Sequence, residues 1–285
     1  MKRFLALTLC IVTLLSLCAC ARNEKYTVAI GVAESVDYEA KTARNAFAGV
    51  VFDKDGKVEL ARLDAIEYSL IFNDGTPKVY VPLAYRDSKG NDDFKAAADY
   101  LEGFVIGKTK DEIKAIVTID GANKYTPELL RALCKACDSV YTTTFESKPT
   151  LVGGVSAFSY VSCDKEKGKV SFGTSFAAIA AENGKIMGAV IDENEISINF
   201  DGEAQTIKSH SYVGTKLEQG EEYHMDEYNP YAIAEWYEQA AAYSHSLYYK
   251  PIDRLAAIPR ENVAGCTIAT ENYFAAAIKA SKRVR

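Results

Sequence analysis

The strongest constraint on the fold of this chain is an internal repeat. From Lys57 and Lys185 onward, two stretches match at a constant offset of 128 positions, in the pairs Asp64 and Asp192, Glu67 and Glu195, Ser69 and Ser197, and Phe72 and Phe200. Each stretch is bounded by glycine turns, namely Asp55-Gly56 and Asp74-Gly75 in the first and Asn183-Gly184 and Asp201-Gly202 in the second. Because glycine accepts the positive φ of tight hairpin turns, each half is predicted to begin as an antiparallel β-meander.

Helical patterns follow the strands in both halves. Apolar residues recur at helical spacing over 94–104 and over 236–247. A later helix is predicted to start at Thr126-Pro127 in the first half and at Thr270 in the second, with Thr as the N-cap. These helices match at offsets of 142 and then 144, so the second half carries an insertion, which falls in the polar stretch 209–228.

Strands followed by helices in each half predict an α+β fold, built as two tandem copies of an antiparallel β-meander packed with helices. We expect residues 1–19 to form a lipoprotein signal peptide, 20–147 the first copy and 148–285 the second. The boundary between the copies lies in the segment 141–154, where Thr, Ser, Pro and Gly cluster.

The amino-terminal segment has the features of an export signal. Lys2 and Arg3 precede an apolar run over 4–17, which is too short for an ordinary transmembrane helix. The run ends in Leu17-Cys18-Ala19-Cys20, which resembles a bacterial lipobox. The resemblance implies that Cys20 is lipidated and becomes the first residue of a mature protein anchored on the outer side of a cell membrane. The simpler alternative is a secretory signal with incidental cysteines.

Charge and motif content exclude several classes of function. Asp and Glu number 39 against 33 Lys and Arg, which gives a net charge of -6. An acidic surface repels phosphate backbones, so no nucleic-acid partner is expected. The sequence contains no Gly-x-Ser-x-Gly elbow, phosphate-binding P-loop or zinc-ligand spacing. Hydrolase and NTPase activities therefore have no support, and no metal site is predicted.

Four cysteines follow the signal segment, and these are Cys134, Cys137, Cys163 and Cys266. Four cysteines allow three fully paired connectivities in an exported protein, but a chain of this length buries a core without such links. Cys134 and Cys137 form a CxxC pair well inside a predicted helix, where core packing is the better interpretation than redox chemistry. The disulfide state is left open.

A glycine turn stands ahead of the last predicted helix in each half. Asp120-Gly121-Ala122-Asn123 lies opposite Ala264-Gly265-Cys266-Thr267, at the offset of 144. With Glu261 before it, the second tetrapeptide resembles the attachment motif in the FMN-binding domain of bacterial electron-transfer flavoproteins. That motif is an Asp and two residues followed by Ser-Gly-Ala-Thr. The segments 107–112, 220–225 and 234–240 also resemble members of this group.

This resemblance implies an FMN site in the second half. Glu261 stands at the acidic position, Gly265 and Cys266 form the turn, and Thr267 matches the residue that the FMN phosphate esterifies in that family. Backbone N–H groups at a glycine turn ahead of a helix suit a phosphate dianion. Trp236 is a candidate to line the slot for the flavin ring. Asn123, at the matching place in the first half, has no hydroxyl with which to form the ester.

Two functions remain open. The first is a lipid-anchored extracytoplasmic FMN protein, an electron carrier or accessory redox subunit that requires a flavin transferase and a membrane redox partner. The second is a non-enzymatic surface lipoprotein that has lost its flavin and binds a ligand or partner. Ala264 and Cys266 replace the Ser and Ala of the attachment motif, and Gly265 with Thr267 also fits an ordinary turn before a helix.

We expect the wild-type protein to partition into a detergent phase, because acyl chains on Cys20 anchor it in membranes. The Cys20→Ser variant is expected in the aqueous phase, whereas Cys18→Ser retains the anchor. Detergent-phase separation followed by immunoblotting measures the partition of all three forms. An unmodified wild type that remains in the aqueous phase would contradict the lipobox assignment.

Overall fold

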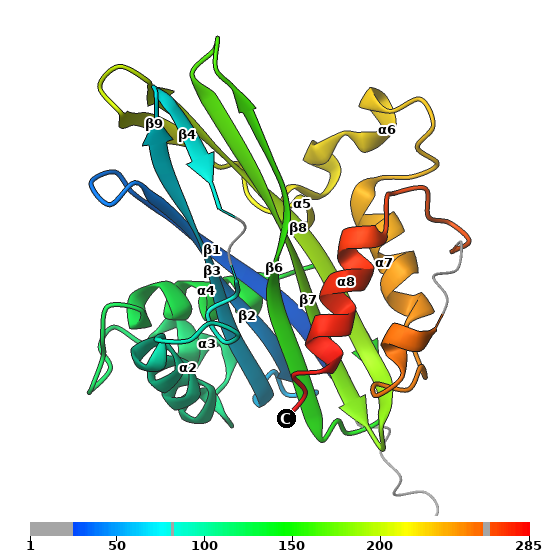
Figure 1. Ribbon diagram of the computed structural model, residues 1–285. Coiled ribbons are helices and arrows are strands. Elements are labelled where there is room, and N and C mark those ends of the chain that lie inside the picture. Colours follow the sequence, from blue (N-terminus) through cyan, green and yellow to red (C-terminus); the bar gives the residue numbers. More distant parts are fainter. Residues whose placement is uncertain (1–24, 81–82, 259–262) are drawn as a thin grey trace, which may run out of the picture.

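The computed structural model describes residues 25–80, 83–258 and 263–285. The signal segment, Cys20 and Glu261 lie outside the described residues. Two antiparallel sheets pack face to face, and helices cover both outer surfaces (Figure 1). The predicted α+β class is therefore confirmed.

The first sheet has the strand order β4-β3-β2-β1-β5. Its strands are β1 (Tyr26–Asp37), β2 (Thr42–Phe52), β3 (Val58–Asn73), β4 (Thr76–Val79) and β5 (Thr143–Phe145). The helices of this half are α2 (Asp92–Val105), α3 (Lys110–Lys114) and α4 (Thr126–Asp138). Helix α4 packs on β1 and β2, and α2 packs on β3, so these two helices cover the outer face of the sheet.

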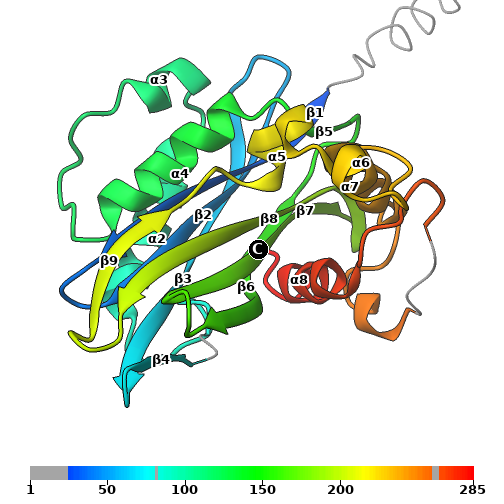
Figure 2. The same ribbon diagram turned by 90° about the horizontal axis from the view of Figure 1, so that it is seen from above.

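The second sheet has the order β6-β7-β8-β9. Its strands are β6 (Leu151–Asp164), β7 (Lys169–Glu182), β8 (Lys185–Asp201) and β9 (Thr206–Ser211). The predicted insertion follows as α5 (Lys216–Gln219), η1 (Gly220–Tyr223) and α6 (Met225–Tyr228). The chain ends with α7 (Trp236–Ser246), η2 (Leu255–Ala257) and α8 (Glu271–Ser281). Helices α7 and α8 cover the face of this sheet that is remote from the first sheet (Figure 2).

The inner faces of the two sheets form a core of aromatic and polar side chains. Phe47 on β2 stacks on Phe176 on β7, with ring centroids 5.9 Å apart and the planes within 3° of parallel. Asn45 and Asn194 exchange hydrogen bonds of 2.8 and 3.2 Å between the sheets. Because both faces of the central strands are buried over most of their length, β2 and β7 are mostly apolar and do not alternate with exposed polar residues, and Asn45 and Thr174 are hydrogen-bonded to each other inside the core.

The predicted N-cap at Thr126 is wrong by one residue. Tyr125 is the N-cap of α4, and Thr126 is the first helical residue. Its hydroxyl instead accepts a hydrogen bond of 3.0 Å from the backbone N–H of Asn123. Thr270 is the N-cap of α8, as predicted, but its side chain makes no capping hydrogen bond. Neither helix start is thus capped by a threonine side chain.

Two glycines bring the last helix of each half directly onto the first strand of its sheet. A Cβ atom on Gly31 of β1 would lie 2.1 Å from the carbonyl oxygen of Ala132 in α4. A Cβ atom on Gly153 of β6 would lie 2.1 Å from the carbonyl oxygen of Ala280 in α8. No larger residue fits at either site without displacing a helix.

We expect Gly31→Ala to lower the free energy of unfolding by about 3 kcal/mol, because the added methyl group overlaps the α4 backbone. Gly103→Ala is the matched control. Its position on α2 is open, since no atom lies within 4 Å of an added Cβ. There the change is expected to stabilise the helix by about 0.5–1 kcal/mol. Urea denaturation of both variants measures the effect, and equal stabilities would contradict the close approach.

Candidate functional site

The described part of the predicted flavin motif forms a turn ahead of α8. Gly265 has a φ of +79°, and Gly121 in the first half has a φ of +75°, so both glycines adopt the left-handed backbone that favours this residue. The backbone N–H of Cys266 donates to the carbonyl of Val263 at 3.1 Å and closes the turn. Glu261 lies outside the described residues.

Thr267 is held by the side chain of Gln239 on α7. The amide oxygen of Gln239 accepts hydrogen bonds from the Thr267 backbone N–H at 2.6 Å, the Thr267 hydroxyl at 3.0 Å and the Ile268 backbone N–H at 3.2 Å. The amide nitrogen of Gln239 donates to the Ala234 carbonyl at 2.7 Å. Gln239 is fully buried. Its oxygen therefore takes the position at the turn where an oxygen of a bound phosphate would accept the same donors.

Trp236, the candidate for the flavin slot, is 1% exposed. Its ring meets Tyr273 of α8 edge to face, with centroids 5.8 Å apart, and the ammonium group of Lys216 lies 5.4 Å from its centroid. Trp236 lies on α7 one turn before Gln239, the residue that binds Thr267. Both predicted site residues are thus connected to the same helix. The structure leaves no accessible ring surface on Trp236 for stacking.

A buried ion pair beside Trp236 was not anticipated from the sequence. Lys216 and Glu193 lie 2.7 Å apart. The carboxylate of Glu193 also accepts hydrogen bonds from the hydroxyls of Ser159 and Ser175. Four elements meet at this carboxylate, which ties the insertion to the outer face of the second sheet. No local pattern marks it, since the partners are far apart in sequence.

The four described cysteines are free thiols, which are Cys134, Cys137, Cys163 and Cys266. Burial raises the pKa of all four, and that of Cys137 to about 11. A raised pKa disfavours the thiolate, which is the nucleophilic form of cysteine. Within the described ranges, no group of His, Cys, Asp and Glu is arranged to hold a metal ion. No described helix is long and apolar enough to cross a membrane.

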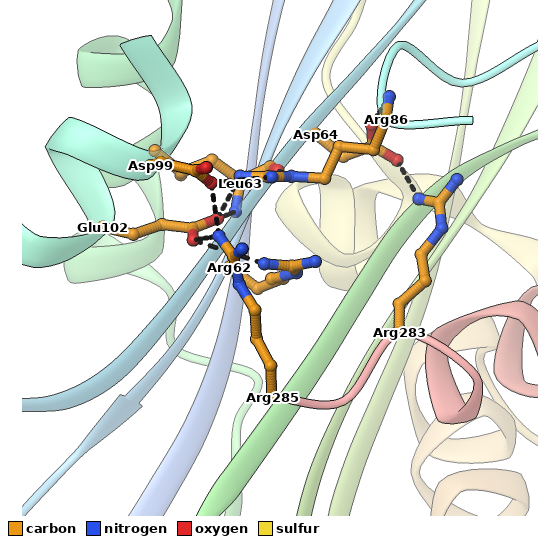
Figure 3. A network of polar contacts seen from close by, with 8 residues as sticks. All are labelled: Arg62, Leu63, Asp64, Arg86, Asp99, Glu102, Arg283 and Arg285. Carbon is orange, nitrogen blue, oxygen red and sulfur yellow. Dashed lines mark hydrogen bonds and ion pairs between the residues drawn. The ribbon is translucent and has the colours of Figure 1, made fainter. Parts of the chain in front are cut away.

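The repeated aspartates lie at the junction of the two halves, and their surroundings differ. Asp64 on β3 is completely buried. Its carboxylate accepts a hydrogen bond of 3.1 Å from the backbone N–H of Ser156 on β6 and lies 2.6 Å from the guanidinium of Arg283 (Figure 3). Arg283 follows α8 and also pairs with Asp87. Burial raises the pKa of Asp64, and the guanidinium opposes this effect.

Further arginines surround Glu102 of α2 on the same side of the junction (Figure 3). Glu102 pairs with Arg86 at 2.6 Å, with Arg62 at 3.4 Å and with Arg285, and it accepts a hydrogen bond of 2.6 Å from the backbone N–H of Leu63. Burial raises the pKa of Glu102 to about 7, against the attraction of Arg86. The segment after α8 thereby contributes two cations to the first half.

Asp192 on β8 is 2% exposed, and no described cation pairs with it. Its carboxylate accepts hydrogen bonds from the backbone N–H groups of Leu217 at 3.1 Å and Glu193 at 2.8 Å. Burial raises its pKa to about 7, although hydrogen bonds from Thr215 and from these amides oppose the shift. The neighbouring carboxylate of Glu218 raises the pKa further.

Two adjoining cavities open beside Asp192. The first, of about 180 Å³, is lined by Asp192, Glu218 and Lys135 and by the segment after α4, which includes Ser139 and Tyr141. The second, of about 410 Å³, lies between that segment, β8 and α7. Both cavities are lined by Val140, Tyr141 and Leu217. We call the pair the junction groove, because residues of both halves form its walls.

The chain matches no family model, no curated protein and no solved structure. The resemblance to FMN-binding domains therefore rests on the motif residues alone.

We expect Asp192→Asn to change how stability depends on pH. The pKa of Asp192 is about 7 in the folded protein and near its ordinary value of 3.8 in the unfolded chain. Between about pH 4 and pH 7 the folded state therefore holds a proton that the unfolded state has lost, so the wild type loses stability as the pH rises through this window. The variant cannot titrate, and its stability relative to the wild type increases over the same range.

Urea denaturation of both proteins across this pH range measures the difference. Glu203→Gln, which removes an exposed carboxylate, is the control and is expected to follow the wild-type profile. A constant difference between Asp192→Asn and the wild type would show that the buried carboxyl group does not titrate in this window.

Proposed function

We propose that this protein is a lipid-anchored extracytoplasmic binding protein without flavin, whose ligand site is the junction groove. The observation that carries the proposal is the position of the Gln239 amide oxygen, which accepts three hydrogen bonds from Thr267 and Ile268. These hydrogen bonds link the turn before α8 to α7, and a phosphate would have to displace Gln239 to reach the donors of Thr267 and Ile268.

The chemistry of the junction groove supports a ligand-binding role. One end carries the buried carboxyl group of Asp192, and the other is lined mainly by apolar and hydroxyl-bearing side chains of β8 and α7. Ligand sites commonly combine an apolar lining with a few polar groups that orient the ligand. Tyr141 and Tyr237 lie against each other at the second cavity, with ring centroids 4.5 Å apart.

We also propose that the two halves are diverged copies of one unit. A four-stranded meander is followed by three helical segments in the first half, and in the second half it is followed by α5, η1 and α6 of the predicted insertion and then by three helical segments, α7, η2 and α8. The matched stretches from Lys57 and Lys185 fall on β3 and β8, and the matched glycines Gly121 and Gly265 share one backbone conformation. A groove between two such copies would arise from their association rather than from either copy alone.

The competing function is an electron-carrying flavoprotein with FMN on Thr267. The left-handed Gly265 and the start of α8 at Glu271 favour it, because this arrangement directs backbone N–H groups toward an anion. FMN attachment would require Gln239 to leave Thr267 and Trp236 to become accessible.

We expect the denatured protein to carry no FMN-phosphoryl mass after co-expression with a flavin transferase, because the Thr267 hydroxyl is already bonded to Gln239. Intact-mass spectrometry of the wild type and of Thr267→Val decides this. A known flavin-carrying protein expressed in the same cells shows that the transferase is active. A mass increment in the wild type that is lost in Thr267→Val would overturn the proposal in favour of the flavoprotein.

A further inference from the structure

The Arg283 contact in the first half has a structural counterpart in the second. Ile66 of β3 bridges to Ala84, and Asn194 of β8 bridges to Thr215, so the segments that begin at 84 and 215 occupy matching places. The backbone N–H of Arg86 then donates to Asp64 as that of Leu217 does to Asp192. The next residue in each segment is acidic.

These acidic residues are Asp87 and Glu218. In the first half, Asp64 and Asp87 together hold the guanidinium of Arg283. In the second half, Asp192 and Glu218 both line the cavity of about 180 Å³. The two carboxyl groups that hold Arg283 in the first half therefore correspond to two carboxyl groups that line a cavity in the second half.

The residue that matches Arg283 is Ser139. Lys135-Ala136 in α4 matches Lys279-Ala280 in α8 at the sequence offset of 144, so these alanines are taken as equivalent positions near the ends of the two helices. Three residues further along the chain come Ser139 in the first case and Arg283 in the second. Ser139 is too short to span the cavity, and its hydroxyl donates to the carbonyl of Tyr141 instead.

Lys135 is the cationic residue among those that line this cavity, and it does not pair with both carboxyl groups as Arg283 does. Its ammonium group lies 2.9 Å from the carboxylate of Glu218, where both side chains are partly exposed, and it forms no ion pair with Asp192. The deeper carboxyl group is thus held only by hydrogen-bond donors without a charge. A buried carboxylate without a cationic partner is unfavourable, and a cation that enters the cavity would relieve this.

We propose that the junction groove binds a small cation with a guanidinium or primary ammonium head, which pairs with Asp192 and Glu218 as Arg283 pairs with Asp64 and Asp87. This inference rests on the proposed function and names the chemical class of its ligand. The head occupies the first cavity. A short apolar chain then extends past Val140, Tyr141 and Leu217 into the second, where Val190, Ile191 and Ala240 line the wall.

Butylguanidinium is the probe for this site, and butylurea is its uncharged analogue of nearly the same shape. We expect isothermal titration calorimetry to detect butylguanidinium and to show at least about tenfold weaker binding of butylurea, because only the cation forms charge-assisted hydrogen bonds. Butylammonium separates the two head groups. Equal affinity for butylguanidinium and butylurea, or no binding of either cation, would overturn the proposal.

Asp192→Asn is expected to weaken butylguanidinium binding at least about tenfold, because it removes the buried carboxylate. Asp138→Asn is the matched control. Asp138 also lines the first cavity, but its carboxylate is already paired with Lys114, so its loss is expected to change the affinity by less than about twofold. Equal effects of the two variants would indicate general charge attraction and not a specific site.

Ser139→Arg tests the same idea without a ligand. The introduced guanidinium would reproduce the Arg283 contact, so we expect the melting temperature to rise by about 3 °C or more and butylguanidinium binding to be lost. Ser139→Gln, of similar length and without charge, is expected to do neither. A Ser139→Arg variant that is less stable than Ser139→Gln and still binds the probe would overturn the proposal.

The outcomes separate this inference from the proposed function. Detection of FMN on Thr267 by mass spectrometry would overturn the proposal of a binding protein without flavin. The calorimetric test of the junction groove would still decide the ligand class by its own result. Absence of both flavin and cation binding would overturn the ligand class alone.

Discussion

The packing of the two sheets against each other is the contact on which the other features of the structure depend. It buries Phe47 against Phe176 and pairs Asn45 with Asn194. Each central strand is thus covered by the other sheet on one face and by a helix on the other. A helix that covers a buried sheet must turn an apolar face toward its strands. Gly31 and Gly153 allow α4 and α8 to approach those strands closely. The junction groove lies at the margin of this contact, where the segment after α4 crosses to β8.

Sheet packing also places carboxyl groups where water is excluded, and the protein treats them in different ways. Asp64 and Glu102 are accompanied by arginines, of which Arg283 and Arg285 come from the far end of the chain (Figure 3). Breaking such a buried pair is costly, because the remaining charge stays buried. The segment after α8 therefore links the two halves by charge, while its backbone pairs with Val152 on β6 within its own half.

Local sequence patterns predicted the local structure well. Hairpin turns at Gly56, Gly75 and Gly184 follow from the need for positive φ, and the helices at 92–105 and 236–246 follow from apolar spacing. The start of α4 was predicted one residue too late, because Thr126 is the first helical residue and its hydroxyl bonds to the loop at Asn123, a contact the pattern does not contain. The role of Gln239 and the cavity beside Asp192 depend on residues brought together from distant elements, and no spacing in the sequence encodes such contacts. The matched pair Asp64 and Asp192 was visible in the repeat, but only the structure distinguishes their partners.

A cation pairs with Asp64 but no described cation pairs with Asp192, and this difference gives a reason for a binding site beside Asp192. If both halves descend from one unit, the same carboxyl group became buried twice when the two sheets packed together. In one half Arg283 stabilises it from within the chain. In the other half Ser139 stands at the matching position, and Asp192 has only uncharged hydrogen-bond donors. An unpaired buried carboxyl group lowers stability, and departures from local rules of this kind are typical of functional sites rather than of structural ones. An external cation would then pair with Asp192 as Arg283 pairs with Asp64. Its binding free energy would include the offset of the cost of burying the Asp192 carboxylate without a cation.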